Sequence, residues 1–180
     1  MSPRVVAQRY AQALFELSQQ QNNLEEIATQ VETLLNLYRE SRLLRNILET
    51  PIYTGSRKIA WLRPLFEKNL HPLLWNFLLL LIRRRREFLL NETCEAFLAI
   101  YDEREKRIRA TIRTAYPLSP SLRETLAQKL QQALSANEVI LTEEVQPALI
   151  GGFVLEVGTR VADVSVRGQL REIEKNLLLS

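Results

Sequence analysis

Glycine is distributed unevenly along this chain, and that distribution strongly limits the fold. Of the 180 residues five are glycines, and only Gly55 lies before residue 150. The other four are Gly151, Gly152, Gly158 and Gly168. Glycine supplies the positive φ angles and tight turns of β-structure but weakens a helix. The sequence therefore predicts a helical front part and a rear part of mixed α and β structure.

In the front part, apolar residues recur with the period of an α-helix. The first helix is expected to bury one apolar face, made of Val6, Tyr10, Ala13, Leu14 and Leu17. Five further helices are predicted at about 24–38, 41–48, 57–65, 73–85 and 88–101. Pro64 should bend or break the fourth of the six helices. Together these segments predict a six-helix bundle.

The rear part begins where the period changes from that of a helix to that of a strand. Residues 108–114 alternate and predict a strand, and Val139–Leu141 predicts a second one. Ser119 and Pro120 are a typical helix cap and first-turn proline. The helix that they open should pack through Leu122, Leu126, Leu130 and Leu134.

The last segment reads as a hairpin and a helix. Phe153–Val157 and Val161–Val164 flank Gly158-Thr159, a two-residue loop that favours a type II′ hairpin. Ser165 is expected to cap a final helix whose apolar residues are Val166, Leu170, Ile173 and Leu177. The predicted fold is mainly α: a six-helix bundle at residues 1–107, then a small α+β domain at 108–180 with the hairpin and terminal helix.

Residue types that carry catalysis or bind metals are scarce. Cys94 is the single cysteine and His71 the single histidine, which excludes a multi-cysteine zinc site within one chain. Glycine-rich phosphate loops and the hydrolase motifs are absent. His71 is expected to be a loop or capping residue, and Cys94 a packed thiol. The sequence predicts a non-catalytic protein without metal or cofactor; a hydrolase of unrecognised chemistry is the least favoured alternative.

Nothing in the sequence predicts insertion into a membrane. The N-terminus lacks the apolar core of a secretory signal. The longest apolar stretch, Leu73–Ile82, covers ten positions, whereas a membrane-spanning helix needs about 20. We therefore expect a cytosolic or matrix location, with attachment to a membrane complex still open.

Arg83–Arg86 is the most conspicuous run of charge. Four consecutive residues on a helix span about 300° of its circumference, so they cannot all line one groove. Solvated arginines at the C-terminal end of an apolar helix also suit the helix dipole, and we favour this interpretation. The alternative is a helical regulator that binds nucleic acid through Arg83–Arg86.

Two helices have surfaces that suit a partner. The fifth predicted helix is apolar nearly all round, so it is either central in the bundle or covered by a partner, and the pattern leaves both open. In the first helix Ala7, Ala11 and Ala13 surround Tyr10. Such small residues leave a shallow groove for another helix, although alanine is also a good helix former.

Residues 147–170 carry a resemblance to a known family. They read PALIGGFVLEVGTRVADVSVRGQL and resemble the C-terminal signature of the delta subunit of bacterial F-type ATP synthase, the oligomycin-sensitivity-conferring protein family. Residues 6–14, 76–86 and 114–119 also resemble segments of this family, and these segments follow one another in the same order as in the family. The signature residues read as structural, and they are Gly151, Gly152, Gly158, Asp163, Ser165, Arg167 and Leu170.

The chain departs from the family's pattern at a few positions. Thr159 and Val164 replace an aspartate and a glycine near the hairpin, and Gln146 replaces an aspartate before Pro147. Arg85 occupies a position that is often glycine. These departures concern the hairpin geometry and the end of the fifth helix.

The resemblance implies a non-catalytic stator subunit of the peripheral stalk. It would link the catalytic alpha/beta headpiece to the b-subunit stalk, so that the head does not rotate with the rotor during proton-driven ATP synthesis. The bundle would hold N-terminal helices of alpha subunits, and the C-terminal domain would meet the C-terminal end of subunit b through the hairpin and final helix. No nucleic acid would bind, and the location would be peripheral to the bacterial inner membrane, on its cytoplasmic side.

Carried over by position, the alpha-binding residues lie on two helices. On the first they are Val6, Tyr10, Ala13 and Leu17; on the fifth they are Phe77, Leu80, Leu81 and Arg84. For each of them, a role in the bundle core is the competing interpretation.

Overall fold

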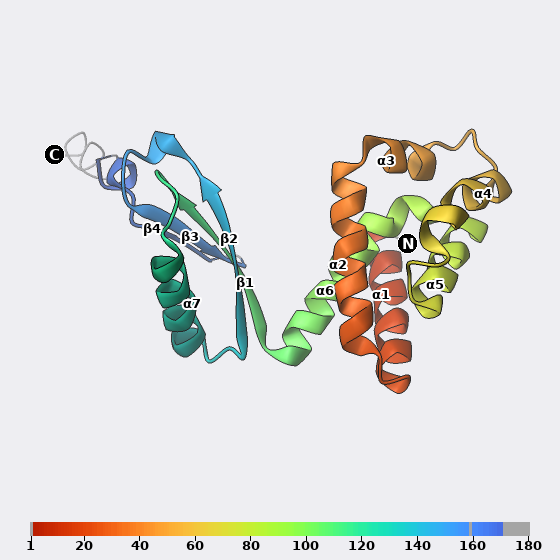
Figure 1. Ribbon diagram of the computed structural model, residues 1–180, viewed down its shortest axis with the longest axis horizontal. Helices are drawn as coiled ribbons and strands as arrows, with labels where there is room; N and C mark the ends of the chain where they lie inside the picture. Colours follow the sequence, from red (N-terminus) through yellow and green to blue (C-terminus); the bar gives the residue numbers. More distant parts are fainter. Residues whose placement is uncertain (1, 159, 171–180) are drawn as a thin grey trace. The chain divides into compact units, whose positions relative to one another are not determined.

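The computed structural model describes residues 2–158 and 160–170 (Figure 1). The chain divides into two compact units, Met1–Tyr101 and Asp102–Ser180. The first unit is helical and the second contains the sheet, as the glycine distribution predicts. The boundary at residues 107/108 stays a prediction, because α6 runs from the first unit into the second.

The first unit is built from six helices and one 3-10 turn. Their bounds are α1 Pro3–Gln20, α2 Leu24–Glu40, α3 Arg42–Glu49, α4 Gly55–Phe66, α5 Pro72–Arg83, η1 Glu87–Leu89 and α6 Leu90–Glu105. Ser41 caps α3, because its side chain accepts a hydrogen bond from the Leu44 amide. Pro64 was expected to bend or break the fourth helix, and it does not break it: α4 continues through Pro64 and ends at Phe66.

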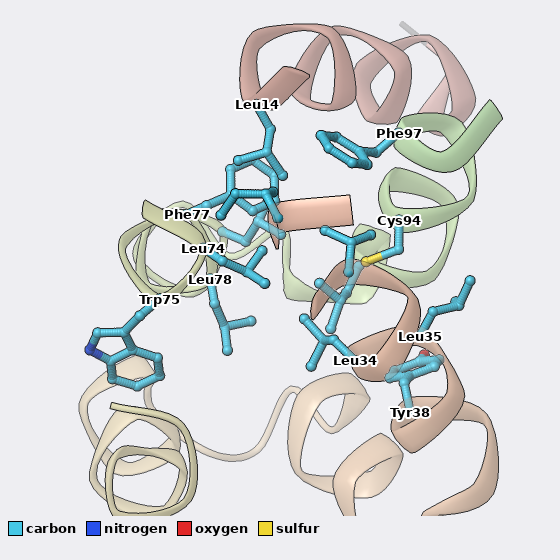
Figure 2. Close-up of a cluster of buried hydrophobic side chains, with 14 of the residues drawn as sticks. Leu14, Leu34, Leu35, Tyr38, Leu74, Trp75, Phe77, Leu78, Cys94 and Phe97 are labelled. Atoms are coloured by element: carbon cyan, nitrogen blue, oxygen red, sulfur yellow. The ribbon is translucent and has the colours of Figure 1, made fainter. Parts of the chain in front are cut away.

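The core of the first unit lies between α1, α2, α5 and α6, as Figure 2 shows. Side chains of α1, α2, α5 and α6 converge there, among them Leu14, Leu34, Leu74, Phe77, Leu78, Cys94 and Phe97. Seven residues of α5 are buried, whereas Leu80 is 41% exposed. The apolar character of α5 is therefore explained mainly by a central position in the bundle.

The expected buried face of α1 is wrong by about one residue. The buried residues are Ala7, Ala11, Leu14, Phe15 and Ser18. Of the expected face only Leu14 is buried; Val6 and Tyr10 are half-buried, and Ala13 and Leu17 are exposed. The buried face of α1 is thus built partly from small residues, and Ser18 satisfies its hydroxyl by donating to the Leu14 carbonyl at 2.6 Å.

The C-terminus of α5 shows why the arginine run does not form one helical surface. The helix ends at Arg83, so Arg84, Arg85 and Arg86 lie beyond it. The Arg86 amide donates to the Leu81 carbonyl and the Arg85 amide to that of Ile82, which is the Schellman pattern. Arg85 has a φ of 54°, a left-handed conformation that glycine adopts more readily than arginine.

A buried ion pair ties three segments of the first unit together. Lys58 of α4 donates to a carboxylate oxygen of Glu87 in η1 at 2.5 Å and to the carbonyl of Leu48 in α3 at 2.7 Å. Both charged side chains are almost fully buried. Such a pair is strongly destabilising to break, because each charge is left without its partner in a low-dielectric interior.

The described part of the second unit contains a four-stranded sheet, the helix α7 and a helical stretch at residues 166–170. Its elements are β1 Arg107–Thr114, α7 Pro120–Leu134, β2 Glu138–Val145, η2 Pro147–Leu149, β3 Phe153–Val157 and β4 Arg160–Asp163. The strand order is β2-β1-β3-β4, with β1 and β2 parallel and the other pairs antiparallel. The helix α7 connects β1 to β2, as parallel pairing requires.

The predicted caps of the second unit are confirmed, and the predicted α7 face is partly wrong. Ser119 accepts a hydrogen bond from the Leu122 amide at the start of α7. Leu126 and Leu130 pack on the core of Ala110, Ile112 and Leu141, but Leu122 and Leu134 are largely exposed. A single helix on a small sheet covers the core with only its middle turns.

The predicted hairpin is present, and its loop joins β3 to β4. Val157 pairs with Arg160, so two residues form the loop, and Gly158 has a φ of 59°. Thr159 lies outside the described residues, so the type II′ assignment stays a prediction. Residues 166–170 are helical, and the predicted helix residues Ile173 and Leu177 lie outside the described residues.

The connection between α6 and β1 is a single residue, Lys106. Arg109 of β1 forms an ion pair with Asp102, in the last turn of α6, at 2.5 Å. The Asn137 side chain donates to the Glu105 carbonyl, and its amide to that of Lys106. The end of α6 is therefore attached to the sheet by side-chain and backbone contacts.

Candidate partner-binding surfaces

The first candidate surface lies on the side of α1 next to its buried face. Val6 and Tyr10 are half-buried there, while Ala13 is exposed and Leu17 is 44% exposed. These residues recur at the spacing of successive helical turns. The residues proposed from the sequence therefore form a partly apolar stripe, which the bundle covers in part at Val6 and Tyr10 and leaves exposed at Ala13 and Leu17.

Aromatic packing joins this stripe to α5. The rings of Tyr10 and Phe77 lie edge to face with centroids 6.1 Å apart, an arrangement that adds to the burial of both rings. Phe77 is nearly buried, and Leu80, one turn further along α5, is the exposed leucine. We define the α1–α5 surface as Val6, Tyr10, Ala13, Leu17, Phe77 and Leu80.

Of the other two residues proposed on the fifth helix, one lies in the core and one at the helix end. Leu81 is fully buried, so it supports the α1–α5 surface from beneath and cannot itself touch a partner. Arg84 is exposed and is the C-cap of α5.

Arg86, which the sequence singled out only as part of the Arg83–Arg86 charge run, also belongs to this region. Its guanidinium donates to the Tyr10 hydroxyl at 3.0 Å and lies 5.7 Å from the centre of the Tyr10 ring. The contact depends on the turn at Arg85, which directs the chain back toward α1.

His71 and Cys94 both have structural surroundings. His71 is the N-cap of α5: its Nδ1 accepts from the Leu73 amide at 3.2 Å, and its own amide donates to the Gln30 side chain at 2.6 Å. Cys94 is buried in the first core. Burial, followed by the nearby Glu95 carboxylate, raises the pKa of the Cys94 thiol to about 12. The thiol therefore stays protonated and unreactive at neutral pH.

The signature residues of the second unit hold a compact turn. A Cβ on Gly152, whose φ is 72°, would lie 2.3 Å from the Val164 carbonyl oxygen. Ser165 Oγ accepts from the Gly168 amide at 3.0 Å. Asp163 in turn accepts from the Ser165 amide at 2.9 Å and from its hydroxyl at 2.6 Å. The predicted capping role of Ser165 is thus confirmed.

The remaining signature positions surround this turn. A Cβ on Gly151 would come within 3.2 Å of Val166, and Gly158 forms the hairpin loop. Arg167 reaches the Ala148 carbonyl at 3.5 Å, and Leu170 is 54% exposed. Most signature residues therefore have structural roles in the hairpin and the turn that follows it.

The second candidate surface lies beside this turn. Within the described part of the second unit, several apolar side chains near the hairpin are exposed: Ile150, Val161, Val164, Val166 and Leu170. We call this set the hairpin surface. Exposed apolar residues concentrated in one segment are typical of a contact region.

Residues 2–158 and 160–170 contain no group of three or more His, Cys, Asp or Glu side chains that could hold a metal ion. No helix in that part of the chain has the length and apolar character needed to cross a bilayer.

Known proteins of one family match this chain over nearly its whole length. The family described as ATP synthase delta (OSCP) subunit matches residues 6–177. The ATP synthase subunit delta of Trichormus variabilis is 36% identical over 172 residues, covering 96% of this chain and 93% of that protein. That of Gloeothece citriformis is 34% identical over 172 residues, covering 96% and 94%.

A solved structure shows the same fold. A chain of the Toxoplasma gondii mitochondrial ATP synthase hexamer aligns with a TM-score of 0.75 and 28% identity, covering 96% of this chain and 97% of that one. This chain belongs to the ATP synthase delta (OSCP) subunit family and is a non-catalytic subunit of the peripheral stalk of F-type ATP synthase.

Proposed function

We propose that the α1–α5 surface holds the N-terminal helix of an alpha subunit. The observation that supports this proposal is the partly exposed stripe of Val6, Tyr10, Ala13 and Leu17, joined to α5 through the Tyr10–Phe77 contact. A helix that docks in a shallow groove needs such anchors on successive turns. Ala13 is small, so it permits close approach of a second helix.

The second attachment in this proposal is the hairpin surface, which meets the C-terminal end of subunit b. With both attachments made, the chain links the alpha/beta headpiece to the stalk, so that the head does not rotate with the rotor. The work is mechanical, and the chain would lie peripheral to a bacterial inner membrane, on its cytoplasmic side. Arg83–Arg86 do not support the nucleic-acid alternative, because α5 ends at Arg83 and Arg86 turns to Tyr10.

Tyr10→Asp tests the first attachment. A carboxylate there would be desolvated by a docked helix without a matching partner, so affinity for an N-terminal alpha peptide should fall at least tenfold, about 1.4 kcal/mol. Isothermal titration calorimetry measures this with the full chain. Affinity for a C-terminal fragment of subunit b should stay unchanged, because the hairpin surface is unaltered.

A matched control carries the same charge elsewhere on α1. Gln8 is exposed and lies about 160° around the helix from Tyr10, so Gln8→Asp should leave alpha-peptide affinity within about twofold. Equal loss in both variants, or no binding of the alpha peptide by the unaltered chain, would remove the α1–α5 surface from the proposal. Circular dichroism confirms that both variants remain folded.

A further inference from the structure

A groove between α4 and the end of α5 has no role in the function proposed so far. Its volume is about 860 Å³, and its lining comes from the first turns of α4 and from the segment where α5 ends. The lining residues are Thr54, Gly55, Ser56, Ile59, Ala60, Arg63, Ile82, Arg83 and Arg85.

The groove combines an apolar floor with positive charge. Ile59, Ala60 and Ile82 supply the apolar part, and the guanidinium groups of Arg63, Arg83 and Arg85 supply the charge. No carboxylate belongs to its lining among the described residues.

The positive charge of this groove is largely unneutralised. Arg83 and Arg85 form no ion pair with a described residue, and Arg63 reaches only Glu67, at 3.6 Å and largely in solvent. An exposed pair of that kind contributes little. The Arg63 and Arg83 guanidinium groups are therefore available to a partner, whereas Arg85 also lines an adjoining pocket that contains Glu49 and Glu87.

This groove is separate from the α1–α5 surface. Ile82 follows Phe77 by five residues, which places the two side chains about 140° apart around α5. Arg85 is held by the backbone hydrogen bonds of the turn that ends α5. The arginine run is therefore divided: Arg83 and Arg85 face α4, while Arg86 contacts Tyr10 on α1.

We propose that this groove binds an acidic segment of another subunit of the synthase, one that carries at least two carboxylates beside apolar residues. Guanidinium groups match carboxylates with paired hydrogen bonds, and such pairs are strong when partly desolvated. The apolar floor fits the side chains of a peptide. No aromatic side chain lines the groove, which speaks against a single-stranded nucleic acid, since its bases would need stacking partners.

The charge requirement is tested in synthase stripped of this subunit and titrated with the full-length chain. Arg63→Glu combined with Arg83→Glu leaves the helix-terminating Arg85 in place and should weaken rebinding about tenfold. The control, Arg42→Glu with Lys68→Glu, makes the same change in net charge at exposed positions outside the groove. It should weaken rebinding less than twofold, and equal losses in the two variants would overturn the proposal.

Folding of the groove variants is checked by thermal melting, and Arg85→Gly serves as a third variant that favours the turn while it removes one guanidinium. It should weaken rebinding about threefold without lowering the melting temperature. Unchanged rebinding by both groove variants would count against an acidic occupant.

The occupant is identified by cross-linking. Ala60→Cys, labelled with benzophenone maleimide, places a photoreactive group on the groove, and native Cys94 is buried and stays unlabelled. The expected product joins residue 60 to a subunit segment with at least two Asp or Glu residues among eight. A product with lipid, nucleic acid or a segment without acidic residues, or no product at all, would overturn the proposal, and Tyr10→Asp should leave the product unchanged, which separates it from the alpha-peptide site.

Discussion

Gly152 and Gly158 both have positive φ, but their surroundings differ. A Cβ on Gly152 would meet the Val164 carbonyl oxygen at 2.3 Å, whereas nothing lies within 4 Å of one on Gly158. Gly158→Ala should therefore lower the free energy of unfolding by about 1 kcal/mol, the cost of placing alanine at a positive φ. Gly152→Ala adds a clash with rigid backbone and should cost roughly 3 kcal/mol or more.

Urea denaturation followed by circular dichroism measures both free energies of unfolding. Equal losses of unfolding free energy in the two variants would contradict this prediction, because they would mean that the backbone near Val164 moves away from the new Cβ at no cost. Gly158→Ala serves as the control for Gly152→Ala, because both variants make the same substitution at a residue with positive φ.

At single positions the sequence predicted capping better than burial. Ser119 and Ser165 cap helices as expected, because a cap depends on a few neighbouring residues. The core face of α1 was misjudged, because Ala7, Ala11 and Ser18 are buried through close packing rather than through hydrophobicity. The alpha-binding residues were proposed from their positions in the family resemblance. Their exposure could be judged only after the structure had shown which face of α1 is buried.

Among the elements, the Lys58–Glu87 pair connects α4, η1 and the end of α3. The second carboxylate oxygen of Glu87 is buried without a hydrogen-bond partner among the described residues. Lys58→Met should therefore cost about 3–5 kcal/mol, because it leaves a buried carboxylate unpaired. Adding Glu87→Leu should recover most of that loss, since the uncompensated charge is then gone.

A double-mutant cycle in urea measures this coupling. Additive losses in the two single variants and the double variant would mean that the two charges do not stabilise each other. The matched surface pair is Arg39 and Glu95, which meet at 2.6 Å but are about half exposed. Its coupling should be below about 1 kcal/mol.

Element order was predictable, and long-range pairing was not. The six helices, the strand at 108–114 and the hairpin follow from local period and turn residues. The parallel pairing of β1 with β2 joins residues about thirty positions apart, and no local pattern distinguishes it from other pairings. The Lys58–Glu87 pair joins residues 29 positions apart, so it was not predictable from the sequence for the same reason.

For the whole chain, we predict that residues 1–107 and 108–180 unfold as separate domains. The core around α5 and the core of Ala110, Ile112 and Leu141 are distinct clusters. Ile112→Ala should destabilise the second core by about 2–5 kcal/mol. Amides of β1 and β2 should then exchange faster with deuterium, while amides of α2 and α5 keep their protection.

The reciprocal variant is Phe97→Ala, which removes a fully buried ring of the first core. It should accelerate exchange in α2 and α5 and leave the strands unchanged. If either variant accelerated exchange throughout the chain, the two segments would form one cooperative unit.

The single residue between α6 and β1 has a mechanical consequence. A flexible tether would stretch and absorb strain before passing on any pull, but Lys106 has almost no slack to give. Tension along the backbone reaches β1 directly, and β1 lies between β2 and β3 in the sheet. Its hydrogen bonds on both sides would have to shear together rather than unzip one by one, so the whole strand shares the load that arrives from the end of α6.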